Sequence, residues 1–194
     1  PMFTLFPYTT LFRSNLVAQL ATDGIVTDEQ PQYLNLSTPD GDVPRREREW
    51  MIDEGPYSRN TFPGEDTYFR FTLANYSKAA GKLSLVGTVV YDDKVSEGGY
   101  EIICQGSNDG KNWTEIGKLS GSGLPGQAVS GRVVVTDPNK QTGETTMPVR
   151  KLNETITFNS ENAYSDYRVL LKMAGAHDWV FTEANFMDKD GGLV

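Results

Sequence analysis

The sequence has one cysteine, one histidine and fewer basic than acidic residues, and each scarcity excludes a class of protein. The single cysteine, Cys104, excludes an internal disulfide. Eighteen lysines and arginines stand against 26 aspartates and glutamates, which gives a net charge of −8. A surface of that sign repels phosphate groups, so neither nucleic acid nor an anionic membrane is an expected partner. No apolar run approaches the ~20 residues that span a bilayer, so membrane insertion is not expected.

Candidates for catalysis are equally few. The only histidine, His177, has no serine or cysteine in a triad-like context, and its simpler interpretation is a residue of a surface turn. Cys104 falls on the inward side of an expected strand, which predicts a buried structural thiol rather than a nucleophile. No pair of acidic residues stands out as the two carboxyl groups of a glycoside hydrolase. The sequence therefore favours a chain that is not itself an enzyme.

Apolar side chains alternate with polar ones along several short segments, a pattern of period two that is typical of β-strands. Phe69, Phe71 and Leu73, for example, share one side of residues 67–73. No window of helical length has a convincing 3.6-residue period. About eight short antiparallel strands with turns between them predict an all-β fold, a β-sandwich of the jelly-roll kind. These eight strands are expected at residues 67–73, 82–91, 100–104, 113–116, 132–136, 155–158, 167–173 and 179–187, with loops at 120–131 and 137–144. Two further short strands are plausible at 32–36 and 49–52.

The strongest turn signal is the polar segment 107–112, which contains Asp109 and Gly110. Asn and Gly tolerate the positive φ that tight turns require. We expect a rigid β-turn here, with Trp113 packed back on the sandwich.

Residues 4–14 read Thr-Leu-Phe-Pro-Tyr-Thr-Thr-Leu-Phe-Arg-Ser and resemble the in-frame translation of a widely used sequencing adapter. A natural strand and a signal peptide are the alternatives, but Pro7 and Arg13 interrupt the apolar run. We therefore expect residues 1–14 to be non-native and residues 15–190 to form one β-sandwich domain. Residues 191–194 would begin a linker or a truncated continuation, so the chain would be a fragment.

Three sets of residues resemble the galactose-binding-like domains (discoidin, or F5/8 type C) of carbohydrate-active enzymes. The hairpin 106–116 is similar to the family's S-x-D-G-x-x-W-x-x-V/I motif. Residues 164–170 and 181–186 resemble its last two strands, and residues 50–55, Phe62 and 67–73 resemble an earlier block. This sequence departs from the family pattern at Glu54, which separates Asp53 from Gly55, and at Phe62 and Thr72. The resemblance implies a jelly-roll sandwich of the galactose-binding-domain type.

Members of this family often hold one structural Ca²⁺ near the closing strand. Carried over by position, the resemblance implies Asp53, Ser58, Thr61 and Glu183 as the metal ligands, all of them oxygen donors that suit a hard cation. The alternative for Glu183 is a hydrogen bond or an ion pair with an arginine such as Arg59. The departure at Glu54 falls within this loop.

The resemblance also implies glycan binding at the loops of one end of the sandwich. There an aromatic face stacks on a sugar ring while polar side chains bind its hydroxyls. Core packing is the alternative for Trp50 and Trp179, and a solvated loop with mutually paired charges is the alternative for the arginines. The candidate ligand-binding residues are Arg45, Arg48, Trp50, Tyr57, Arg59, His177 and Trp179.

The leading hypothesis is a non-catalytic carbohydrate-binding or ancillary module of an exported bacterial glycoside hydrolase, such as an enzyme of the α-L-rhamnosidase-like kind. Its location would be periplasmic, cell-surface or extracellular. Its partner would be a glycan, or the catalytic domain of the same polypeptide. Two alternatives are a structural spacer that braces the catalytic domain, and a cell-surface adhesion or protein-binding module. Exposed aromatics at the loop end would favour binding, and buried Trp50, Trp179 and Tyr57 would favour the spacer.

Overall fold

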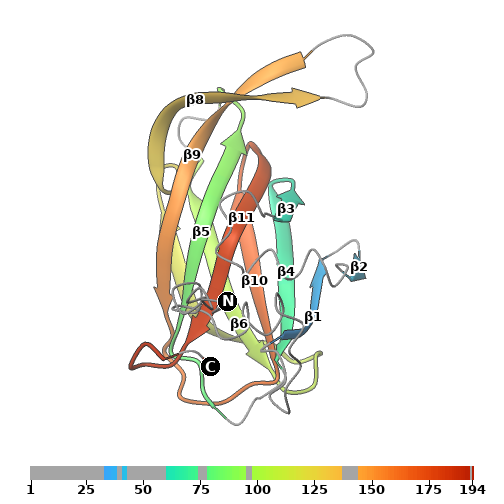
Figure 1. Ribbon diagram of the computed structural model, residues 1–194, viewed down its shortest axis with the longest axis vertical. Helices are drawn as coiled ribbons and strands as arrows, with labels where there is room; N and C mark the ends of the chain where they lie inside the picture. Colours follow the sequence, from blue (N-terminus) through green and yellow to red (C-terminus); the bar gives the residue numbers. More distant parts are fainter. Residues whose placement is uncertain are drawn as a thin grey trace, which may run out of the picture.

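The computed structural model describes residues 33–38, 41–42, 60–73, 78–94, 98–136, 144–192 and 194. These residues form two antiparallel sheets that share one core (Figure 1), so the expected all-β antiparallel sandwich is confirmed. Eleven strands lie in the described residues, where about eight were expected, and two of the eleven have four residues or fewer. The six-stranded sheet has the order β2 (Gly41–Asp42), β1 (Tyr33–Thr38), β4 (Asp66–Leu73), β10 (Asp166–Met173), β6 (Tyr100–Ser107) and β7 (Thr114–Gly121). The five-stranded sheet has the order β3 (Asn60–Pro63), β11 (Ala176–Met187), β5 (Lys82–Tyr91), β9 (Glu144–Thr157) and β8 (Gln127–Thr136).

Alternation of side chains decides which face of each strand enters the core. On β10, Tyr167, Val169, Leu171 and Met173 are buried, whereas Arg168, Leu170 and Lys172 are partly exposed. The same period of two runs through β5 and β11. Neighbouring strands come from distant parts of the sequence, because β10 pairs with β4 on one side and with β6 on the other. The inward faces of the two sheets therefore meet in one apolar layer.

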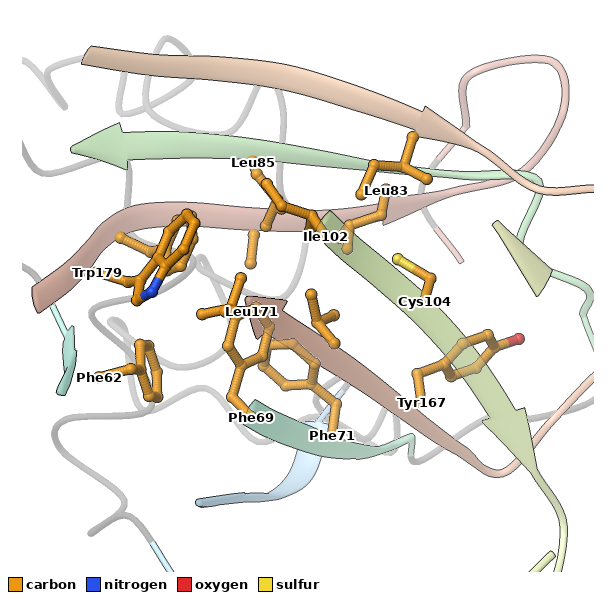
Figure 2. Close-up of a cluster of buried hydrophobic side chains, with 14 of the residues drawn as sticks. Phe62, Phe69, Phe71, Leu83, Leu85, Ile102, Cys104, Tyr167, Leu171 and Trp179 are labelled. Carbon is orange, nitrogen blue, oxygen red and sulfur yellow. The ribbon is translucent and has the colours of Figure 1, made fainter. Parts of the chain in front are cut away.

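Aromatic side chains dominate that layer (Figure 2). The Phe69 ring lies 5.0 Å from Phe62, 5.2 Å from Phe71 and 5.5 Å from Phe181, centroid to centroid. These four rings come from β3, β4 and β11, so they join the two sheets. Cys104 is buried in the same layer, as expected, and burial raises the pKa of its thiol well above the usual range.

The hairpin of β8 and β9 is much longer than the sequence pattern predicted. We expected strands only at 132–136 and 155–158 and a loop at 120–131, whereas β8 begins at Gln127 and β9 begins at Glu144. Pairing between β5 and β9 ends at Val90 and Val149, so the rest of β9 pairs with β8 alone and continues past β5 (Figure 1). Pro148 lies in this last part of β9, which has no partner strand on its β5 side. A proline has no backbone N–H to donate, so it is tolerated along an unpaired strand edge.

Two segments with sequence-based expectations cannot be compared with the structure. The strand expected at 49–52 and residues 1–14 lie outside the described residues. The connection between the strands expected at 167–173 and 179–187 is shorter than those ranges imply, because β11 already begins at Ala176. Val194 donates its backbone N–H to the Phe186 carbonyl at 3.3 Å, next to the closing strand. In the part of the chain that is described, no helix is long and apolar enough to cross a membrane.

Candidate functional site: an arginine–aromatic face on the six-stranded sheet

The outer face of the six-stranded sheet carries polar side chains at the positions that alternate with the core. In this sheet Arg168 of β10 stands beside Arg70 of β4 and beside Gln105 of β6. The neighbours of Arg168 along the strand, Tyr167 and Val169, are buried. The pairing therefore lines up the three polar side chains in one row across the middle of the sheet.

The hairpin between β6 and β7 is fixed by its own hydrogen bonds. The Asp109 Oδ1 atom accepts the backbone N–H of Lys111 at 2.8 Å and that of Asn112 at 2.7 Å. These bonds, that of Asn112 first, lower the pKa of the Asp109 carboxyl well below its usual range. Gly110 has a φ of +67°, as the sequence predicted. The turn therefore delivers the next residues in one defined direction.

Trp113 follows this turn and packs back on the sandwich, as expected. There its ring lies against Arg70 and Arg168. The Arg168 Cζ atom lies 4.4 Å from the centroid of the Trp113 ring and 5.6 Å from that of Tyr68. Arg70 also lies over Trp113, at 5.3 Å. Cation–π contacts of this kind contribute about 0.5–2 kcal/mol each, depending on desolvation. We call Tyr68, Arg70, Gln105, Trp113 and Arg168 the arginine–aromatic face.

The two arginines of the face have different partners. Arg70 donates to Asp166 Oδ1 from Nε at 3.0 Å and from Nη2 at 2.6 Å, so a carboxylate neutralises it. Asp166 is buried, and it also accepts the Thr72 hydroxyl at 2.9 Å. Arg168 instead donates from Nε and Nη2 to the amide oxygen of Gln105, at 3.0 and 2.6 Å. Among the described residues no carboxylate forms an ion pair with Arg168.

An open pocket of about 570 Å³ lies at the other end of the same sheet, where β6 begins and β10 ends. Tyr100, Glu101 and Lys172 contribute to its wall, and Glu101 forms an ion pair with Lys118 of β7. Lys172 lies four residues from Arg168 along β10, which corresponds to about 13 Å at ~3.3 Å per residue. Because 168 and 172 share one side of the strand, the pocket and the arginine–aromatic face belong to the same outer surface.

Seven of the residues predicted from sequence to bind a ligand or a metal have no described position. Arg45, Arg48, Trp50, Tyr57, Arg59, Asp53 and Ser58 lie outside the described residues, and their roles stay predictions.

The remaining two ligand-binding candidates lie on β11 rather than in a turn. Trp179 is 0% exposed and packs in the core (Figure 2), so the prediction that it contacts a ligand is wrong. Core packing was the alternative, and the alternation of β11 explains it. His177 is partly exposed, and its Nδ1 atom lies 2.8 Å from Asp178 Oδ2. It belongs to the five-stranded sheet and is not part of the arginine–aromatic face.

The expected calcium ligands are described only in part. Thr61 of β3 pairs with Val180, and Glu183 follows three residues later on β11. The Glu183 carboxylate accepts the Asn185 amide at 3.3 Å and is partly buried. An oxygen donor at this edge suits a hard cation. Within the described ranges no group of three or more histidine, cysteine or acidic side chains could hold a metal ion, and calcium binding stays a prediction.

Sequence reasoning missed the arginine–aromatic face. It placed Tyr68 and Arg70 opposite the apolar side of their strand, and it identified the turn before Trp113. It had no signal for the pairing of β4 with β10, which are about 100 positions apart. That pairing brings Arg168 to Tyr68, and the pairing of β10 with β6 brings Arg168 to Gln105 and Trp113.

Comparison with known proteins gives structural likeness alone. Neither protein-family models nor curated proteins match this sequence. The CBM32-6 module CpGH89CBM32-6, produced by Clostridium perfringens, is 14% identical over 79% of this chain and 91% of its own, with a TM-score of 0.43. The CBM32 of AlyQ, in complex with 4,5-unsaturated mannuronic acid, is 14% identical over 80% and 95%, with a TM-score of 0.45. A non-crystalline cellulose specific carbohydrate-binding module, CBM28, is 8% identical over 66% and 72%, with a TM-score of 0.41. These three solved structures are carbohydrate-binding modules, and the likeness is one of fold.

Proposed function

We propose that this chain is a non-catalytic carbohydrate-binding module of an exported bacterial glycoside hydrolase, and that the glycan binds on the arginine–aromatic face. The observation that carries the proposal is Trp113, a partly exposed indole held by a rigid turn beside the planar groups of Arg168 and Gln105. Aromatic rings bury apolar area at low conformational cost, and the C–H face of a sugar ring is an apolar surface of suitable size. Amide and guanidinium groups next to it bind hydroxyls.

The rest of the outer surface extends this site. Leu170 and Ile103 are cross-strand neighbours in the row next to Arg168, and they separate it from the open pocket. Lys172 and Glu101 supply polar groups in that pocket. A surface with polar groups at both ends and apolar side chains between them suits a ligand longer than one sugar unit.

A non-catalytic role is supported by the nucleophile candidates that can be described. The Cys104 thiol is buried and its pKa is raised by burial, so a reactive thiolate does not form at neutral pH. His177 is within hydrogen-bond distance of an aspartate and has no serine or cysteine partner among the described contacts.

The test is affinity electrophoresis and calorimetry of the chain against a panel of neutral and acidic polysaccharides. Trp113→Ala should weaken binding of the recognised glycan about tenfold, which corresponds to ~1.4 kcal/mol. Val129→Ala is the matched control, because Val129 is 43% exposed on β8 of the other sheet. A Trp113→Ala variant that folds and binds with unchanged affinity would exclude this face as the glycan site.

The second candidate function is a spacer that packs against a catalytic domain without touching sugar. Two observations favour it: Trp179 is buried, and Val129 and Val133 of β8 are exposed at 43% and 37% on the long hairpin. A panel in which no glycan binds at millimolar concentration would support the spacer over the binding module.

A further inference from the structure

Among the described residues no carboxylate pairs with the half-buried guanidinium of Arg168, and this is the least explained feature of the arginine–aromatic face. Arg70, one strand away, is matched by the buried carboxylate of Asp166. For Arg168 the described residues offer only the neutral Gln105 amide and two rings. Burial lowers the pKa of Arg168, and the charge of Arg70 acts in the same direction. Burying the Arg168 charge costs desolvation free energy, and its contacts with neutral partners offset only part of that cost.

The Arg168 guanidinium also has N–H donors for which the described residues provide no acceptor. An arginine carries five N–H donors in a planar fork, and here Nε and Nη2 donate to one oxygen of Gln105. The described residues provide no acceptor for Nη1. The Arg168 Cζ atom lies within cation–π distance of the Tyr68 and Trp113 rings, which restrict the positions that the guanidinium can take. A preorganised planar fork with open donors matches a carboxylate, which can accept two parallel N–H bonds.

No described carboxylate near Arg168 forms an ion pair with it, although Glu115 of β7 is the cross-strand neighbour of Gln105. Asp166 is already bound to Arg70, and Glu101 is already bound to Lys118. The overall charge of −8 acts from farther away. At 0.1 M salt the Debye length is about 10 Å, so nearby groups dominate the interaction with a ligand on this face.

We infer that the glycan recognised on the arginine–aromatic face is acidic, and that Arg168 binds the carboxylate of a uronic acid residue. This inference rests on the proposed function, because it presumes that a glycan occupies this face. It adds a substrate class, uronate-containing polysaccharide, and assigns the specificity-determining contact to one side chain. Trp113 then supplies stacking area and Arg168 supplies the selection for charge.

The experiment compares each acidic polymer with its neutral counterpart. Polygalacturonate, alginate and hyaluronan are each tested beside their carboxyl-reduced neutral forms, and dextran sulfate is tested beside dextran. Wild type should bind at least one polyuronate ten or more times tighter than its reduced form. Raising NaCl from 50 to 500 mM should weaken that binding, because an exposed charge pair is screened by salt.

Variants at Arg168 assign the selection to this residue. Arg168→Gln should remove the preference for the acidic polymer, so that its affinities for the acidic and the reduced polymer lie within twofold of each other. Arg168→Lys keeps the charge but loses the planar fork, so it should retain only part of the preference. Lys151→Gln is the matched control, since it removes one exposed charge from β9 of the other sheet. Thermal midpoints within a few degrees of wild type confirm that each variant folds.

The outcomes separate this inference from the proposed function. Equal binding of acidic and reduced polymers, lost in Trp113→Ala, would overturn the acidic-ligand inference and leave the carbohydrate-binding module in place. Selective binding of dextran sulfate without any polyuronate would overturn the carboxylate assignment. Binding of no polymer at all would contradict the proposed function itself.

Discussion

Replacing Phe69 by alanine should be among the most destabilising changes available in this chain. Phe69 is 0% exposed, and it contacts the rings of Phe62, Phe71 and Phe181 at 5.0–5.5 Å. Truncation of a buried phenylalanine to alanine costs about 3–5 kcal/mol through lost burial and the remaining cavity. Each aromatic pair adds roughly 0.5–1.5 kcal/mol beyond its burial, so we expect a loss near the upper end, about 4–5 kcal/mol. That is a large fraction of the 5–15 kcal/mol typical of a folded domain.

The assay is reversible urea unfolding followed by tryptophan fluorescence, with thermal unfolding as a second measurement. For a domain of this size 1 kcal/mol corresponds to roughly 2–4 °C, so the midpoint should fall by about 8–20 °C. Val133→Ala is the control, because Val133 is 37% exposed and should change stability by less than about 0.5 kcal/mol. A loss below about 1 kcal/mol for Phe69→Ala would show that these rings do not form the joint between the two sheets.

Three further predictions concern the turn, the thiol and the calcium ligands. Gly110→Val should destabilise the domain by about 1–3 kcal/mol, because Gly110 has a φ of +67°, whereas Gly123→Val, which meets no atom within 4 Å, should not; equal chemical-denaturation midpoints for the two would refute this. Cys104 should react with a thiol reagent no faster than the protein unfolds, since burial raises its pKa; rapid labelling of the native protein would contradict its burial. If Asp53, Ser58, Thr61 and Glu183 hold Ca²⁺, EDTA should lower the melting temperature of wild type and not that of Glu183→Gln; an EDTA-insensitive wild type would exclude the site.

The sequence predicted the central strands well, because their two faces differ sharply in polarity. Residues 82–91 were expected as a strand and form β5, and 167–173 became β10 with one added residue. The alternation there reports burial directly: one face of each strand meets the core, and the other meets solvent or polar partners.

The long hairpin was hidden because its local signals oppose strand formation. The segment 120–131, which ends in the start of β8, is rich in glycine and serine and contains Pro125, and β9 contains Pro148. A bulge between Ala128 and Arg132 further breaks the alternation. The pairing partner overrides these preferences, and a partner is not visible in a local window.

The candidate site was the least predictable part, because it depends on which strands are neighbours. The family resemblance directed attention to the loop end, where Trp179 proved to be a core residue. The side chains that gather on the outer sheet come from positions 68, 105, 113 and 168, and each looks ordinary in its own segment. Their chemistry arises only from the strand order of the six-stranded sheet.

The most direct test of glycan binding on the arginine–aromatic face is the NMR spectrum of the tryptophan indole N–H groups. The chain has three tryptophans, so three signals are expected, with Trp113 assigned by Trp113→Phe. On titration with a bound oligosaccharide, the Trp113 signal should shift in proportion to saturation, and the signal of the buried Trp179 should stay in place. A titration that shifts only the Trp50 signal, or that saturates while Trp113 stays unmoved, would contradict the account and place the glycan elsewhere.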